Sequence, residues 1–108
     1  MEKDKVKDGT AYTVGNFRGA KNWDYRIIKS KPILYSHFVQ EEPHFSIHEV
    51  YYNELEEVVS YTAHSVSPYG DTYDELERDL ELFLSAKDKP ILDEEELLKS
   101  FKEKFNTN

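Results

Sequence analysis

The 108-residue chain contains no cysteine, so it can form no disulfide, no thiolate metal site and no cysteine nucleophile. It also lacks a long apolar run, and none approaches the ~20 residues that a membrane-spanning helix needs. The first ten residues are largely charged, which indicates that no signal peptide is present. These absences favour a cytoplasmic protein without a membrane segment.

Positive charge is scarce after the first third of the chain. Residues 1–31 hold eight Lys/Arg and four Asp/Glu, a balance of +4, whereas residues 32–108 hold six and eighteen, a balance of −12. The two sum to the net charge of −8. Such an acidic body repels phosphate backbones, so direct nucleic-acid binding is not expected, and it attracts a basic protein partner. Solubility alone would also account for this charge, and the sequence leaves both interpretations open.

The length suits one domain. Residues 1–22 are predicted to form a flexible or weakly ordered arm, with room for a short edge strand at 12–14, and residues 23–105 a single α+β domain. Alternating or β-branched segments predict strands at 23–29, 33–39, 44–52 and 58–67, with a turn at 53–57. In the third strand the apolar residues change phase, so either both faces are covered or a bulge lies near Glu49. The short connections favour an antiparallel meander of three to four strands.

The main helix is predicted from the stretch that follows the strands. Pro68 ends the last strand, Gly70 is expected to turn the chain with a positive φ, and Thr72 and Glu75 have the spacing of a capping box. An apolar stripe then follows at helical spacing, formed by Tyr73, Leu76, Leu80, Phe83 and Leu84. A main helix at 73–86 and a short helix over about 93–105 are expected to cover one face of the sheet.

A β-meander, the turn Gly70-Asp71-Thr72, an acidic residue at Glu75 and a leucine-rich helix together resemble the amino-terminal domain of HicB-type antitoxins, over roughly residues 25–85. The resemblance implies a degenerate, partly RNase-H-like α+β fold. It also implies that the chain binds and blocks a small basic toxin that cleaves mRNA. The chain departs from the family in having no cysteine before the turn, and residues 93–105 are too few for the DNA-binding domain with which the family often regulates its own operon.

Four histidines offer a metal-binding alternative: His37, His44, His48 and His64. On one strand face His44 and His48 would lie ~13 Å apart, so a single ion would need a histidine from another strand, with Glu49 as a further ligand. The other interpretation is a scatter of half-exposed strand histidines. On balance we predict no metal and no cofactor.

Catalysis is not predicted either. The paired carboxylates, Asp79 among them, are expected in turns and on the outer helix face, where solvent screens them. Metal catalysis of the RNase H type needs acidic residues on the central strands, and these offer little beyond Asp24 and Glu49.

Tyrosine is the most informative residue type, with eight in the chain. Tyrosines that are not in the core would enrich a surface for protein binding. The predicted binding residues are Tyr51, Tyr52, Glu54, Glu56, Glu57, Tyr61 and Tyr69. We therefore expect a small, acidic, non-enzymatic protein-binding module that occludes a basic partner, such as a small ribonuclease toxin, and that can form a homodimer through a sheet edge. The alternatives are an acidic decoy that mimics nucleic acid, from a mobile element, and a metal-binding protein that uses the histidines.

Overall fold

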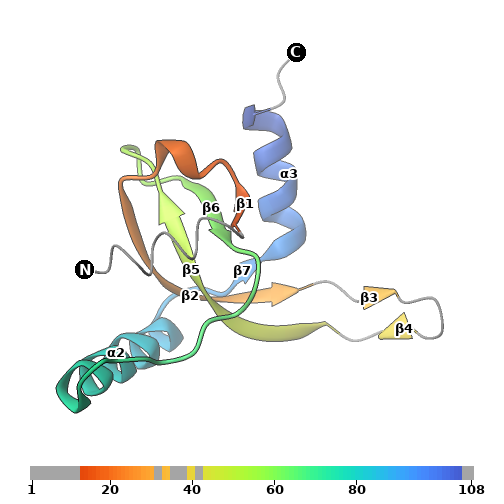
Figure 1. Cartoon of the computed structure of the whole chain (residues 1–108). Helices are drawn as coiled ribbons and strands as arrows, with labels where there is room; N and C mark the ends of the chain where they lie inside the picture. Colours follow the sequence, from red (N-terminus) through yellow and green to blue (C-terminus); the bar gives the residue numbers. More distant parts are fainter. Residues whose placement is uncertain (1–12, 31–32, 35–38, 41–42, 106–108) are drawn as a thin grey trace.

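The computed structural model describes residues 13–30, 33–34, 39–40 and 43–105, and it confirms the α+β class (Figure 1). A five-stranded sheet has the order β1-β6-β5-β2-β7, and two helices accompany it. In chain order the elements are β1 (Thr13–Gly15), the 3-10 turn η1 (Phe17–Gly19), β2 (Asn22–Ser30), β3 (Ile33–Leu34), β4 (Val39–Gln40), β5 (His44–Tyr52), β6 (Val58–Thr62), α2 (Tyr73–Ser85), the 3-10 turn η2 (Ala86–Asp88), β7 (Leu92–Asp93) and α3 (Glu94–Phe105).

The expected antiparallel meander is present as β2, β5 and β6. β1 extends it as an edge strand beside β6, so the expected arm joins the sheet from Thr13 on, while residues 1–12 lie outside the described part. β7 was not expected as a strand, and it pairs with β2 in parallel. In place of one strand at 33–39 the structure has the antiparallel pair β3 and β4, and residues 35–38 between them are not described.

β6 is shorter than expected because side-chain hydrogen bonds replace the backbone ladder between β5 and β6 at Thr62. The Thr62 carbonyl accepts a hydrogen bond from Nδ1 of His48, at 2.8 Å. The Thr62 hydroxyl accepts one from the backbone N–H of Glu49, at 3.3 Å. The regular ladder therefore ends at Thr62 instead of continuing to residue 67, and beyond it one backbone hydrogen bond joins the Val66 N–H to the Ile47 carbonyl at 2.9 Å.

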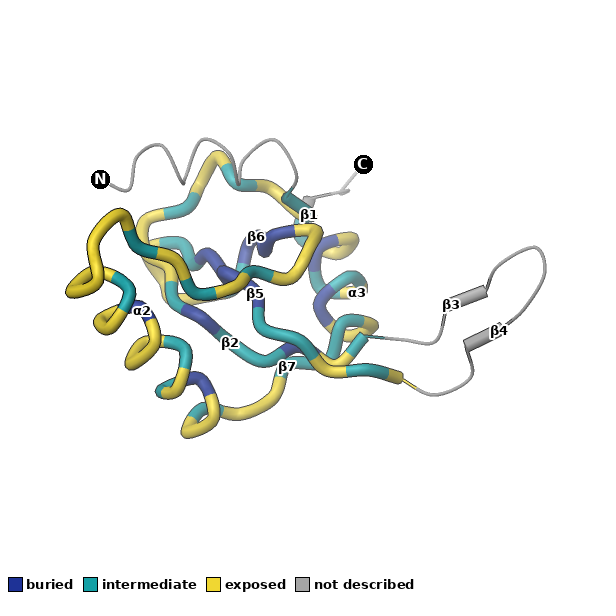
Figure 2. The backbone as a smooth tube through the Cα atoms, turned by 60° about the horizontal axis from the view of Figure 1, so that its bottom comes forward, coloured by how far each residue is buried: buried dark blue, intermediate teal, exposed yellow. Residues whose placement is uncertain are grey.

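The two helices cover opposite faces of the sheet, whereas one shared face was expected (Figures 1 and 2). Val50 pairs with Tyr61, and the two form the main core with Ile28 of β2 and with Leu97 and Phe101 of α3. Successive residues of a strand point to alternate faces of the sheet. Tyr25, three positions before Ile28 on β2, therefore projects from the face opposite to the main core. The helices separate because the chain passes the outer edge of β2, where it forms β7, on its way from α2 to α3.

On the α2 side the ring of Tyr25 lies 4.1 Å from that of Phe83, centroid to centroid. Trp23 lies edge-on to Tyr25, with ring centroids 5.1 Å apart. Residues 48–51 of β5 are all buried, so both of its faces are covered, and its register with β6 also shifts, between Tyr51 and Tyr52 rather than near Glu49.

The turn before α2 is built as the sequence suggested, with one difference. The Thr72 hydroxyl accepts from the Glu75 N–H at 3.1 Å, which confirms the helix cap. The Glu75 carboxylate accepts from the Asp71 N–H, at 3.0 Å, instead of from the cap residue itself. Gly70 does not have the expected positive φ. Glycine is needed there because a Cβ would lie 2.2 Å from the backbone nitrogen of Leu76.

Candidate protein-binding surface

Helix α2 contacts the sheet with a different face from the predicted one. Leu76 and Phe83 are half-buried as expected, and between them the helix buries Asp79. The other three stripe residues are exposed: Tyr73 by 73%, Leu80 by 48% and Leu84 by 63%. Most of the helix surface faces solvent (Figure 2). The apolar stripe is therefore divided, and half of it is presented outward.

Asp79 explains this rotation, because its carboxylate is the central attachment of α2. One oxygen accepts a hydrogen bond from the Tyr25 hydroxyl at 2.7 Å, and the other accepts from the backbone N–H of Tyr69 at 2.8 Å. Asp79 is 9% exposed, so the prediction that it lies on the solvated outer face is wrong. A buried carboxylate needs such partners, and these two come from strand β2 and from the segment that precedes the helix. Rotating α2 to bury Leu80 would break both bonds.

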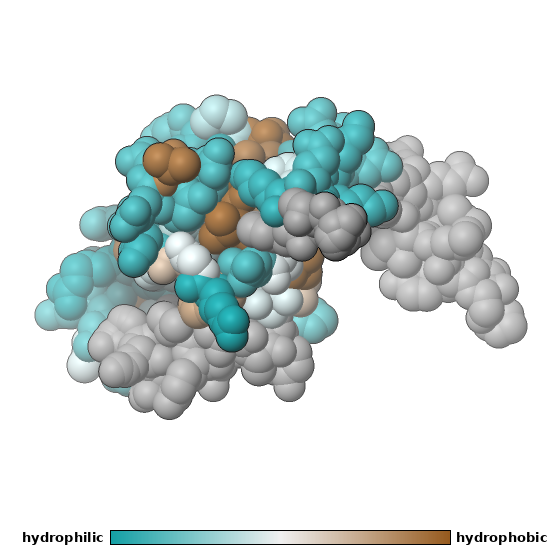
Figure 3. All heavy atoms as spheres, turned by 90° about the horizontal axis from the view of Figure 1, so that it is seen from above, coloured by the Kyte–Doolittle hydropathy of each residue, from teal (hydrophilic) through white to brown (hydrophobic). Residues whose placement is uncertain are grey.

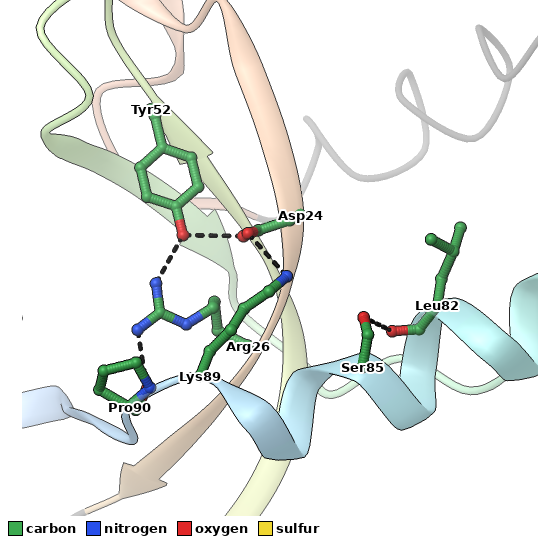
Figure 4. A network of polar contacts seen from close by, with 7 residues as sticks. All are labelled: Asp24, Arg26, Tyr52, Leu82, Ser85, Lys89 and Pro90. Carbon is green, nitrogen blue, oxygen red and sulfur yellow. Dashed lines mark hydrogen bonds and ion pairs between the residues drawn. The ribbon is translucent and has the colours of Figure 1, made fainter.

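A second group of polar contacts holds the end of α2 and η2 against β2 (Figure 4). Lys89 forms an ion pair with Asp24 at 2.9 Å, and the Arg26 guanidinium donates to the Pro90 carbonyl at 2.7 Å. The Tyr52 hydroxyl joins the two, since it donates to Asp24 at 2.7 Å and accepts from Arg26 at 2.8 Å. The orientation of α2 is thus fixed at its middle and at its carboxyl-terminal end.

The outward side of α2 is acidic. Its thirteen residues include five Asp/Glu and one arginine, a balance of −4. Asp74, Glu77 and Glu81 are exposed, and none of them forms an ion pair with another described residue. Figure 3 shows a different side, the top of the molecule as drawn in Figure 1, where hydrophilic side chains surround patches of hydrophobic ones. Carboxylates beside exposed leucines can bind a partner that is both basic and apolar.

A second acidic element is the turn at 53–57, which was predicted as a turn. The Asn53 side chain organises it by accepting from the N–H groups of Leu55 and Glu57, each at 2.9 Å. Leu55 is 76% exposed, and Glu54, Glu56 and Glu57 are exposed around it. The hydrogen bond from Asn53, followed by the charge of Lys104, lowers the pKa of Glu57. Glu56 has a φ of +63°, an uncommon conformation for a residue with a side chain.

The predicted binding tyrosines do not form one surface. Tyr51 and Tyr61 are 2% and 1% exposed, so they cannot offer contact area in this fold. Their hydroxyls donate to Glu49 at 2.5 Å and to Glu94 at 2.9 Å. Burial, reinforced by these carboxylates, raises the pKa of both phenols.

The remaining predicted residues lie in two places. Tyr52, which is half-buried, leads into the turn at 53–57. Tyr69 is exposed and precedes α2, where it donates to Asp71 at 2.7 Å. A binding role for the predicted set stays a prediction, and its exposed members belong to two separate elements.

The histidines are dispersed in the described segments. Both ring nitrogens of His48 are in use: Nδ1 bonds the Thr62 carbonyl, and Nε2 accepts from the Ser46 hydroxyl at 2.9 Å. Burial lowers the pKa of His48. Among the described residues there is no group of three or more His, Cys, Asp or Glu that could hold a metal ion. His37 lies outside those residues.

The two strand acids considered for RNase-H-type chemistry are also separated. Asp24 pairs with Val50, and Glu49 pairs with Tyr25. Because adjacent strand residues alternate in direction, the two carboxylates project from opposite faces of the sheet. They cannot bind one metal ion together.

Comparison of the chain with protein-family models, with curated proteins and with solved structures found no match. Over the described segments, neither helix has the length and apolar content that a membrane crossing requires. The exposed surface of α2 and the turn at 53–57 therefore have to be interpreted from their own chemistry.

Sequence reasoning missed that Asp79 is buried and that Leu80 and Leu84 are exposed. The signal was present in the spacing. Asp79 lies three residues after Leu76 and four before Phe83, which is the position of an inward-facing residue on a helix. A carboxylate in that position indicates a buried hydrogen-bond partner as much as an interruption of the apolar stripe.

Proposed function

We propose that this chain is a non-enzymatic protein-binding module that occludes a basic protein acting on nucleic acid, as the resemblance to HicB-type antitoxins implies. The observation that carries the proposal is the outward side of α2. There, three carboxylates without ion pairs within the described structure flank exposed leucines. A protein that binds RNA needs a basic surface, and an acidic surface of this kind is complementary to it.

The arrangement of polar groups supports binding over catalysis. The phenols of Tyr25, Tyr51 and Tyr61 each donate to a carboxylate and are largely buried, so they serve the fold. Asp24 and Glu49 project from opposite faces. The side chains exposed on α2 include carboxylates and leucines, which are suited to recognising a protein surface.

The decoy alternative needs carboxylates alone, spaced like phosphates along one ridge. On α2 the carboxylates share their surface with Leu80 and Leu84, whose exposure favours a protein partner that also contributes apolar groups. We therefore keep the decoy as the second candidate.

The test purifies each small basic protein that is found to be encoded beside this chain. Each is assayed for RNA cleavage with increasing amounts of the intact protein, at low and at moderate salt. We expect stoichiometric inhibition by one of them, with binding that weakens as salt rises. The variant E77K/E81K should lose inhibition, whereas E103K on α3 should keep it. Inhibition that is equal for a panel of unrelated basic nucleases would favour the decoy, and no inhibition of any neighbour would contradict the proposal.

A further inference from the structure

The exposed side of α2 has the residue spacing of a coiled-coil seam. Tyr73, Glu77, Leu80 and Leu84 follow one another at intervals of four, three and four residues. This spacing places side chains on one narrow line along a helix, at alternating a and d positions. The line from Tyr73 to Leu84 is ~16 Å long at 1.5 Å per residue. We call these four residues the seam.

The seam is unoccupied by the rest of the described chain. Its three apolar members keep between about half and three quarters of their surface exposed. The position itself is well fixed, since the Asp79 carboxylate holds the helix to Tyr25 and to the Tyr69 N–H. A rigid apolar line can accept a second helix at little cost in conformational entropy.

Glu77 decides which kind of helix fits. It lies inside the seam between Tyr73 and Leu80, and it has no ion pair with a described residue. Asp74 and Glu81 flank the line on the side away from Leu76 and Phe83. A helix docked on the seam would bring its own side chains against three carboxylates, so lysine or arginine must stand there.

A second copy of this chain does not satisfy that requirement. Two α2 helices facing each other through their seams would place carboxylate against carboxylate, at a charge balance of −4 on each helix. Like charges at such positions disfavour pairing. Charge complementarity therefore favours a different protein.

We propose that the seam of α2 binds an amphipathic basic helix of the partner protein, side by side with α2. The partner helix would carry leucine-type residues at heptad spacing and a lysine or arginine opposite Glu77. This inference rests on the proposed function and deepens it, because it names the surface and the element of the partner that meets it.

The experiment uses the intact protein and three synthetic 18-residue peptides. One is a helix-forming Lys/Leu peptide in which a single a or d position holds lysine, to face Glu77, and every other a and d position holds leucine. The second has the same composition in an order without helical periodicity. The third replaces lysine with glutamate. Binding is measured by calorimetry, and the contacted residues are located by backbone amide NMR shifts.

We expect the periodic basic peptide alone to bind, with shifts concentrated in residues 73–85. The variant L80A/L84A should weaken binding about tenfold, because each leucine loses contact area in the seam. The matched control L82A removes a leucine that is 52% exposed on the same helix but off the seam, and it should change affinity less than about twofold. Circular dichroism checks that all variants retain their helix content.

Three results would overturn the inference: equal binding of the aperiodic peptide, equal loss with L82A, or a dimer of the intact protein that L80A/L84A dissociates. The inference can fail without the proposed function. Inhibition of a basic nuclease that is unaffected by L80A/L84A would refute the seam alone, whereas seam binding without inhibition of any neighbour would refute the nuclease partner alone.

Discussion

The Tyr25 hydroxyl donates a 2.7 Å hydrogen bond to Asp79, joining β2 to α2 across 54 positions of the sequence. Both residues are buried, at 3% and 9% exposure. This bond attaches the helix that presents the seam and the carboxylates beside it. The orientation of the proposed binding surface therefore depends on one phenol and one carboxylate.

Replacing Asp79 by alanine should lower the free energy of unfolding by about 2–3 kcal/mol, because it leaves the Tyr25 hydroxyl and the Tyr69 N–H without their acceptor. Urea denaturation measures the loss. The control E81A removes an exposed carboxylate of the same helix and should change stability by less than about 0.5 kcal/mol. In a double-mutant cycle Y25F should cost less in the D79A background than alone. Additive losses would show that the two groups do not interact.

His48 should make stability fall in mild acid. Burial lowers the pKa of His48 below the ordinary 6.5. Below about pH 6.5 His48 therefore binds a proton in the unfolded chain but stays neutral in the folded chain. The free energy of unfolding then decreases as pH falls from 6.5 towards the folded pKa, by at most about 1.4 kcal/mol per pH unit. The free energy of unfolding, measured by denaturation at several pH values in this range, should depend less on pH for H48Q than for the parent protein. An unchanged slope would assign the pH dependence to other groups.

Alkaline pH should destabilise the protein through its buried tyrosines. Burial and a hydrogen bond to Asp24 raise the pKa of Tyr52 to about 12, and burial raises the pKa of Tyr25, Tyr51 and Tyr61 still further. Above pH 10 the unfolded chain releases these protons first, so stability falls as pH rises. Ultraviolet titration of tyrosinate should show these four of the eight tyrosines ionising only with unfolding. Full ionisation near pH 10 in a folded chain would contradict this prediction.

Gly70 and Gly19 should differ in their tolerance of alanine. A Cβ at Gly70 would lie 2.2 Å from the Leu76 nitrogen and 2.7 Å from the Glu75 carbonyl carbon, so G70A should cost about 1–3 kcal/mol. A Cβ at Gly19 meets nothing within 4 Å, so G19A should stay within about 0.5 kcal/mol of the parent protein. Thermal melting distinguishes the two. Equal melting temperatures would show that the turn before α2 shifts to make room.

Local patterns predicted the elements well. The strand at 44–52 and the helix from Tyr73 agree with the structure, because alternation and capping are properties of neighbouring residues. The end of β6 could not be predicted, since it depends on the His48 ring binding the Thr62 carbonyl across the sheet. The sides on which the helices lie depend on β7 joining the edge of β2, and two residues carry too little pattern to reveal that.

The surface was harder to predict than the fold. Apolar spacing alone predicted that Leu80 and Leu84 lie in the core. The rotation of α2 is instead determined by the Asp79 carboxylate, which accepts hydrogen bonds from the Tyr25 hydroxyl and the Tyr69 N–H. The acids of the turn at 53–57 were correctly expected in a turn. Tyr51 and Tyr61 could not be recognised as buried from composition, because each needs a particular carboxylate to satisfy its hydroxyl.

The chain holds one tryptophan, and Trp23 lies edge-on to Tyr25, which in turn contacts Phe83 and Asp79 of α2. Trp23 is already 38% exposed, and detachment of the helix would remove the neighbours of Tyr25 and expose the indole further. Intrinsic fluorescence therefore gives a label-free optical signal of whether α2 is seated, separately from the α3 side of the sheet.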